Sequence, residues 1–195
     1  EAGLWNDAYF IDERSFASTG SSRRVDIIDL DADPPEVVID DSGRLNTLHI
    51  HLPDDRIVLD FDGNLSVESI NNRVPILNID ATPTSMVLND AGTQLAVTTT
   101  SNRVLLIDLE TQTIQRTQRF GGRVLDVEFN PAGDLIAVSV NQNGLKTVEL
   151  WQPDDDTRTP LVVYDVIIGD VAFSPTGDQL IVMATDGRVI VLDLE

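Results

Sequence analysis

The sequence predicts an all-β fold built from repeated, four-stranded antiparallel sheets, and two observations carry this prediction. A short apolar strand recurs with corresponding positions at 28, 68, 107, 151 and 192, which lie 40, 39, 44 and 41 residues apart. Turn-forming residues separate several short apolar runs within each interval, and no stretch has a trustworthy helical periodicity. A repeat of about 40 residues with several strands per unit is typical of a β-propeller.

The last two units show the strand pattern best. In the first of them, 124–129 and 135–140 are predicted strands joined by the tight turn Asn130-Pro131-Ala132-Gly133-Asp134. Residues 141–144 are predicted to form the next turn, which leads into a third strand that ends at Trp151. The fourth strand of this unit is predicted at 161–164.

The final unit follows the same scheme but is shorter. Its dipeptide Asp186-Gly187 is the strongest hairpin signal in the chain, and the sequence stops after a third strand that ends at Leu194. An unpaired strand edge favours aggregation, so we expect more chain, a partner or an irregular closure to cover it. We predict a single propeller domain, or part of one, over 1–195, with approximate blades at 1–43, 44–80, 81–122, 123–165 and 166–195, the last incomplete.

The composition excludes several classes of function. With 33 acidic against 13 basic residues and a net charge of −20, the chain repels nucleic acid and anionic membranes. No apolar run approaches the roughly 20 residues that span a bilayer, so we expect a soluble protein. There is no cysteine, which rules out disulfides and thiolate metal sites. The compartment stays open, with an inclination toward an extracytoplasmic one.

Two turns and three strand ends resemble a known superfamily. The turns Asn130-Pro131-Ala132-Gly133-Asp134 and Ser174-Pro175-Thr176-Gly177-Asp178 resemble the Ser-Pro-Asp-Gly turn of bacterial WD40-like and YVTN-type propellers. The strand ends Ile107-Asp108, Leu192-Asp193 and Trp151-Gln152 resemble degenerate forms of the Trp-Asp ending, whereas the Gly-His dipeptide of regular WD40 units is absent. This resemblance implies a propeller, and a binding platform more often than an enzyme.

Three aspartates occupy matching places in the repeats and form the candidate site. Asp7, Asp126 and Asp170 each precede by three residues a phenylalanine at the end of a first strand, and Ser85 takes this place in the third unit. If the units are blades, these residues surround one end of the central channel, where carboxylates would hold a cation or a basic peptide. The alternative is that each aspartate accepts hydrogen bonds from nearby backbone amides.

The other acidic stretches have simpler interpretations. Residues 29–33 alternate carboxylates as a calcium loop does, but Pro34 stands where that loop needs glycine, which favours a solvated loop. Residues 60–64 are predicted to form a hairpin turn, and Asp154-Asp155-Asp156 an exposed acidic loop.

The chain offers little for catalysis. His49 and His51 lie on one side of a predicted strand at a spacing that can bind a metal, but no other histidine or cysteine completes a site. There is no Gly-x-Ser-x-Gly elbow, and neither histidine has an evident serine partner. We therefore predict no enzyme activity from this segment, no catalytic or cofactor-binding residue, and calcium as the one conceivable cofactor.

The sequence leads to two hypotheses of function. The first is a non-catalytic protein–protein interaction or scaffold module, with a protein partner that is basic or bridged by cations. The alternative is a cation- or small-ligand-binding propeller domain of a larger enzyme or sensor, with Asp7, Asp126 and Asp170 in the channel.

Overall fold

The structure, a computed structural model, describes residues 5–10, 13–20, 25–31, 36–37, 45–51, 56–61, 64–69, 75–80, 82–164 and 168–194. The chain divides into two compact units, Glu1–Thr82 and Pro83–Glu195, and each is treated by itself below. All regular elements of the described residues are β-strands, and none of these residues belongs to a helix that would be long and apolar enough to cross a membrane.

The first unit contains two antiparallel sheets whose strands follow the chain order. Sheet A is formed by β1 (Trp5–Phe10), β2 (Ser15–Gly20), β3 (Val25–Asp29) and β4 (Glu36–Val37). Sheet B is formed by β5 (Leu45–His51), β6 (Arg56–Phe61), β7 (Asn64–Ser69) and β8 (Pro75–Asp80). The β6–β7 connection is a hairpin, as predicted for 60–64, with 62–63 outside the described residues.

The second unit contains three more sheets of the same kind. Sheet C is formed by β9 (Pro83–Leu88), β10 (Gln94–Thr99), β11 (Arg103–Asp108) and β12 (Thr113–Arg119). Sheet D is formed by β13 (Arg123–Phe129), β14 (Ile136–Gln142), β15 (Leu145–Gln152) and β16 (Thr157–Tyr164). Sheet E has three strands, β17 (Ile168–Phe173), β18 (Gln179–Ala184) and β19 (Val189–Asp193).

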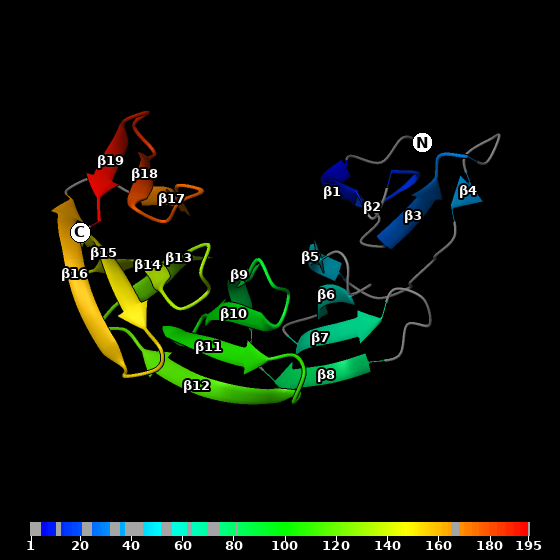
Figure 1. Ribbon diagram of the computed structural model, residues 1–195, viewed down its shortest axis with the longest axis horizontal. Helices are drawn as coiled ribbons and strands as arrows, with labels where there is room; N and C mark the ends of the chain where they lie inside the picture. Colours follow the sequence, from blue (N-terminus) through cyan, green and yellow to red (C-terminus); the bar gives the residue numbers. More distant parts are fainter. Residues whose placement is uncertain are drawn as a thin grey trace. The chain divides into compact units, whose positions relative to one another are not determined.

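In every sheet, each strand pairs antiparallel with the next strand in the chain, as Figure 1 shows. The prediction of an all-β protein made of antiparallel sheets is thereby confirmed. The arrangement of these sheets as a propeller stays a prediction. The fourth strand β12 had no strong apolar pattern in the sequence, because its residues are largely polar and exposed.

The turns between the first and second strands of sheets C, D and E share one geometry. They begin at Asn89, Asn130 and Ser174, whose carbonyl oxygens accept a hydrogen bond from the N–H of the glycine three residues later. Each of these glycines has a positive φ of 65° or 77°, which glycine adopts without steric cost. The first side chain of each turn accepts hydrogen bonds from backbone N–H groups at the turn's far end.

The hairpins between second and third strands differ from the sequence prediction in one respect. Asn141 and Gln142 belong to β14, and the turn consists of Asn143 and Gly144 alone, with φ angles of 52° and 85°. Positive φ at both central residues is the type I′ turn, which asparagine–glycine favours. By contrast, Asp186-Gly187 forms a longer turn in which only Gly187, with φ 91°, is left-handed.

Two apolar layers hold the second unit together. The layer between sheets C and D is built from Ala96, Val104, Leu106, Phe120, Val124, Val127, Phe129, Ile136, Val138, Val140 and Trp151. The layer between sheets D and E is built from Ala137, Val148, Ile168, Val171, Leu180 and Val182. Because side chains alternate between the two faces of a strand, β14 contributes Val138 to the first layer and Ala137 to the second.

Candidate functional site

The first strands of the three sheets of the second unit lie side by side, with β13 between β9 and β17. Asp126 of β13 connects them through hydrogen bonds. The Ser85 hydroxyl of β9 donates to Asp126 Oδ1 at 3.0 Å, and the Val171 N–H of β17 donates to Asp126 Oδ2 at 3.2 Å. The structure thus brings together positions that lie 41 and 45 residues from Asp126 in the sequence.

A β-bulge precedes each of the matching positions that the sequence singled out. The register of the first hairpin shifts between Trp5 and Asp7 in sheet A, just before Asp126 in sheet D, and just before Asp170 in sheet E. In sheet C the shift comes before Ser85, which pairs with Thr98. A bulge bends the strand and redirects the next side chain. The bulge therefore marks the same place in the repeated sheet, directly before Ser85, Asp126 and Asp170 in sheets C, D and E.

The surroundings of Asp126 are unfavourable for its charge. Burial raises the pKa of this carboxyl, and the nearby Asp170 carboxylate adds to the effect, whereas the hydrogen bonds from Val171 and Ser85 oppose it. Asp170 itself is exposed, so it lies on the solvent side of this group. Asp126 is thus a partly buried carboxyl that two neighbouring strands hold in place.

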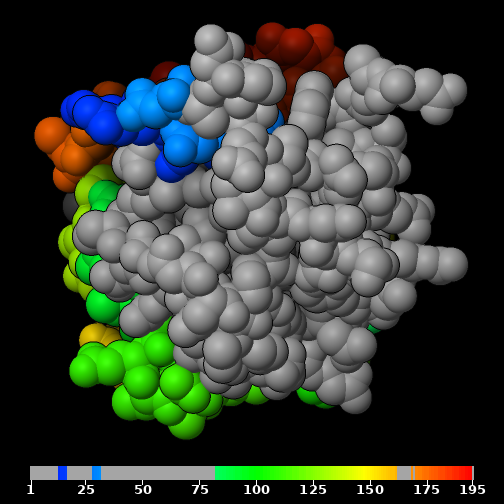
Figure 2. Space-filling view, turned by 90° about the vertical axis from the view of Figure 1, so that its right-hand side faces the viewer, coloured from blue at the N-terminus to red at the C-terminus, as the bar shows by residue number. Residues whose placement is uncertain are grey.

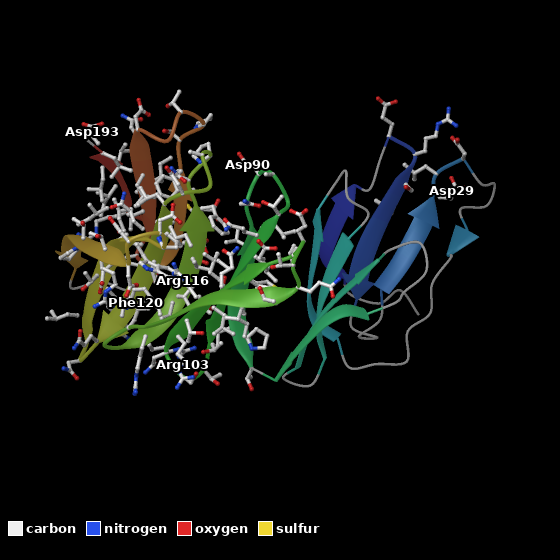
Figure 3. The ribbon with its side chains drawn as sticks, turned by 60° about the horizontal axis from the view of Figure 1, so that its bottom comes forward. Asp29, Asp90, Arg103, Arg116, Phe120 and Asp193 are labelled. Atoms are coloured by element: carbon white, nitrogen blue, oxygen red, sulfur yellow. The ribbon has the colours of Figure 1, made fainter. Side chains whose placement is uncertain are left out.

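Glu128 and Asp90 extend the group toward the turn that follows β9. Burial first, and then repulsion from Asp126 and from Asp90, together raise the pKa of Glu128 to about 7. Asp90 stands exposed in the β9–β10 turn, where Figure 3 labels it. Ser85, Asp90, Asp126, Glu128 and Asp170 are called the carboxylate cluster below.

The pH dependence of stability should reveal Glu128. Because its pKa is higher in the folded than in the unfolded state, the folded state binds the extra proton between about pH 4.5 and 7, and stability falls as pH rises through this range. We expect Glu128→Gln to remove this decline and to raise the free energy of unfolding at pH 8 by about 1 kcal/mol. Urea denaturation at pH 4.5, 6 and 8, compared with the unchanged chain, measures the effect.

Glu110→Gln is the matched control, because it removes the same charge from an exposed side chain. It should lower the general self-repulsion of the chain and leave the decline between pH 4.5 and 7 in place. If the free energy of unfolding depended on pH in the same way in Glu128→Gln and Glu110→Gln, a raised pKa of Glu128 in the folded chain would be contradicted.

The cluster can accept hydrogen bonds, bind protons and attract cationic groups. The part of the chain that the structure describes contains no group of three or more histidine, cysteine or acidic side chains arranged to hold a metal ion. Asp126 already accepts two hydrogen bonds from protein groups, which favours a role in joining sheets C, D and E.

The remaining predicted site residues fall partly outside the described side chains. Asp7 lies in β1, and His49 and His51 lie in β5, but the structure describes only their backbone. Of the stretch 29–33, Asp29 accepts a hydrogen bond from the Asp31 N–H at 2.8 Å, and Asp31 forms an exposed ion pair with Arg14. Figure 2 shows 13–16 and 28–31 in blue at the surface, whereas 32–35 and 38–44 are not described.

The acidic loop 154–156 has a structural function that the sequence did not indicate. All three aspartates are exposed, and Asp156 has a left-handed φ of 61°. Its Oδ1 accepts a hydrogen bond from Trp151 Nε1 at 3.2 Å, so this loop satisfies the one polar atom of a fully buried tryptophan side chain. An aspartate five residues after a tryptophan is too common a spacing for this hydrogen bond to be predicted from a single sequence.

Arginines also join the outer strands of sheets C and D. Arg116 Nε of β12 donates to the Pro153 carbonyl at 3.1 Å, and Arg158 of β16 donates to the Arg119 carbonyl at 3.2 Å. The Arg158 guanidinium also lies 5.0 Å from the centre of the Phe120 ring. Figure 3 labels Arg116 and Phe120. Sequence reasoning had treated these basic residues only as part of the net charge.

Comparison with known proteins adds no relative: no family model matches the chain, and none of the curated proteins matches it.

Proposed function

We propose that this chain is a non-catalytic protein–protein interaction or scaffold module, built as a WD40-like β-propeller. The observation that carries the proposal is the repeated antiparallel sheet, whose first strands β9, β13 and β17 lie side by side in the second unit. Sheets that repeat in chain order and adjoin through their first strands are what propeller blades require. Such a scaffold presents loops and strand edges to partners, and its acidic surface favours a basic or cation-bridged one.

The hydrogen bonds of Asp126 support a structural role for the carboxylate cluster. A carboxylate that accepts one hydrogen bond from each neighbouring strand is oriented by the protein rather than kept open for a ligand. Matching bulges precede Ser85, Asp126 and Asp170 in sheets C, D and E, so these residues occupy one place in the repeated sheet. On this basis the cluster contributes to packing, and partner binding takes place elsewhere on the module.

One observation favours the alternative, a cation- or small-ligand-binding domain. Asp170 repels the Asp126 carboxylate, and Asp126 and Asp90 repel that of Glu128; a bound cation would relieve this repulsion. Calcium would then stabilise the folded chain, because a ligand that binds only the folded state raises its melting temperature.

The double variant Asp126→Asn/Asp170→Asn distinguishes the two functions when thermal unfolding is followed with and without calcium. For the interaction module, we expect calcium to shift the melting temperature equally in the unchanged chain and in the variant. The variant should be less stable by about 1–2 kcal/mol, because an amide cannot replace both acceptor oxygens of Asp126. The variant Glu110→Gln/Asp154→Asn removes two exposed charges and serves as the control.

A calcium response of several degrees that the double variant alone abolishes would overturn the interaction module in favour of the cation site.

An array of extended peptides of graded charge provides the positive test of the interaction module. The proposal predicts retention of basic, partly apolar peptides that weakens with added salt, and failure of every peptide to bind would contradict it.

A further inference from the structure

The two ends of sheets C and D carry opposite charge. At one end lie the connections 100–103, 119–123 and 141–146, which join β10 to β11, β12 to β13 and β14 to β15. These connections contain no acidic residue and four basic ones, called the basic end below: Arg103, Arg119, Arg123 and Lys146. The turns at the opposite end contain no basic residue and several acidic ones: Asp90, Glu110, Asp134, Asp154, Asp155 and Asp156.

Strand register brings the members of the basic end together. Arg103 begins β11 and lies directly opposite Arg119, which ends β12. Arg123 begins β13 and lies opposite Asn141 of β14, and Lys146 of β15 lies opposite the same asparagine. Like charges placed directly opposite each other destabilise a sheet. The fold therefore keeps cations close together at this end although their repulsion opposes it.

The three arginines of the basic end are exposed. Among the described residues, the guanidinium groups of Arg103, Arg119 and Arg123 form no ion pair and donate no hydrogen bond. Arg116 and Arg158 differ, because each donates to a backbone carbonyl of the neighbouring sheet. The arginines of the basic end are thus available to a ligand, in a chain with 33 acidic residues.

The backbone that carries these arginines is held in place. Phe120, which follows Arg119, is buried, and its N–H donates to the Asn102 carbonyl at 3.0 Å. Gly122 lies so close to β14 that an added Cβ would be 2.2 Å from the Asn141 carbonyl oxygen. A ligand that binds here orders side chains only, which costs less conformational entropy than ordering a mobile loop.

The chemistry of the basic end favours carboxylates over nucleic acid. Arginine binds a carboxylate through two parallel N–H···O bonds. Single-stranded nucleic acid also requires exposed aromatic rings on which its bases stack. The one aromatic residue of the three connections is Phe120, labelled with Arg103 in Figure 3, and it is 2% exposed with the Arg158 guanidinium 5.0 Å from its ring centre. The net charge of −20 also repels a long polyanion, whereas a short acidic segment contacts the basic end alone.

We propose that the basic end is a docking surface for an extended acidic segment of a partner protein. Arg103 and Arg119 bind one carboxylate of the segment, and Arg123 and Lys146 attract a carboxylate farther along it. The acidic turns at the opposite end of the sheets repel the segment and so direct it to the basic end. This inference rests on the proposed interaction function and adds a second surface, whose partner has the opposite charge.

The probe is a labelled hexaglutamate peptide, added to the full chain and followed by fluorescence anisotropy. We expect saturable binding that weakens with added salt. Arg103→Gln/Arg119→Gln should weaken binding at least about tenfold, because the charge-assisted hydrogen bonds are lost. The matched control Arg14→Gln/Arg188→Gln removes two exposed arginines elsewhere and should stay within about threefold of the unchanged chain.

Thermal unfolding shows whether the variant is folded. Arg103→Gln/Arg119→Gln removes a pair of like charges, so its melting temperature should be no lower than that of the unchanged chain. If the double variant fails to fold, Arg123→Gln decides the question and should weaken binding about threefold or more. Equal binding by the unchanged chain and the folded variant, or no binding of hexaglutamate, would overturn the docking surface.

Other occupants of the basic end give different results. A thymidine oligonucleotide of similar charge that bound more tightly than hexaglutamate, and through the same arginines, would overturn a protein partner in favour of nucleic acid. A mass that doubles with concentration in the unchanged chain but not in Arg103→Gln/Arg119→Gln would also overturn the proposal, since carboxylates of a second copy would then occupy the basic end.

The peptide array separates failure of this surface from failure of the proposed function. If the chain retains basic peptides but not hexaglutamate, it remains an interaction module and the basic end is not a docking surface. If the chain retains no peptide of either charge, both the docking surface and the interaction module are contradicted.

Discussion

Gly122→Ala should destabilise the chain by about 3 kcal/mol or more. Gly122 precedes β13, and a Cβ added to it would lie 2.2 Å from the Asn141 carbonyl oxygen and 2.8 Å from the Gln142 Cα. These are backbone atoms of β14, so relief requires β13 to move away from the strand with which it pairs. Urea denaturation followed by circular dichroism measures the loss.

The neighbouring glycine provides the control for this substitution. A Cβ on Gly121 would approach only the side chain of Gln142, at 2.9–3.2 Å, and a flexible exposed side chain can rotate away. We expect Gly121→Ala to cost less than about 1 kcal/mol. Equal effects of the two substitutions would contradict the close approach of this loop to β14.

Trp151→Ala should be the most damaging core substitution, at about 3–5 kcal/mol. Trp151 is fully buried between sheets C and D and lies 6.5 Å from the Phe120 ring in an edge-on arrangement. Its removal leaves a large cavity and deprives Asp156 of the Nε1 donor. Thermal unfolding should begin at least about 6 °C lower, given 2–4 °C per kcal/mol for a chain of this size.

Two further substitutions separate the contributions of Trp151. Leu145→Ala, at a residue that is 54% exposed on the same strand, should change stability by less than about 0.5 kcal/mol. Asp156→Ala keeps the ring but leaves its N–H unpaired, and should cost about 1–2 kcal/mol. If Trp151→Ala reduced stability as little as Leu145→Ala, the buried position of Trp151 between sheets C and D would be contradicted.

Local turn chemistry explains why much of the strand pattern could be predicted. Asn130-Pro131-Ala132-Gly133 and Ser174-Pro175-Thr176-Gly177 place glycine where a left-handed residue is needed, and apolar runs adjoin both turns. The repeat spacing then located the corresponding strands elsewhere. The outer strand β12 is exposed, so its sequence has no alternation of apolar and polar residues. Its pairing with β11 in the structure identifies it as a strand.

The candidate site could be predicted only in part, because its geometry depends on neighbouring repeats. The repeat pattern selected Asp126, Asp170 and Ser85, and the structure shows Asp126 bonded to Ser85 and to the N–H next to Asp170. The bulge before Asp126 and the repulsion between Glu128 and Asp90 arise from strand register and tertiary packing. The sequence pattern contains neither.

Thermal unfolding with and without calcium, compared between the unchanged chain and Asp126→Asn/Asp170→Asn, tests most directly the claim that this is an interaction module in which Asp126 joins neighbouring strands. The account predicts that calcium shifts the melting temperature equally in the two chains. A calcium-dependent rise of several degrees that the double variant abolishes would contradict the account, because the carboxylates would then bind a cation.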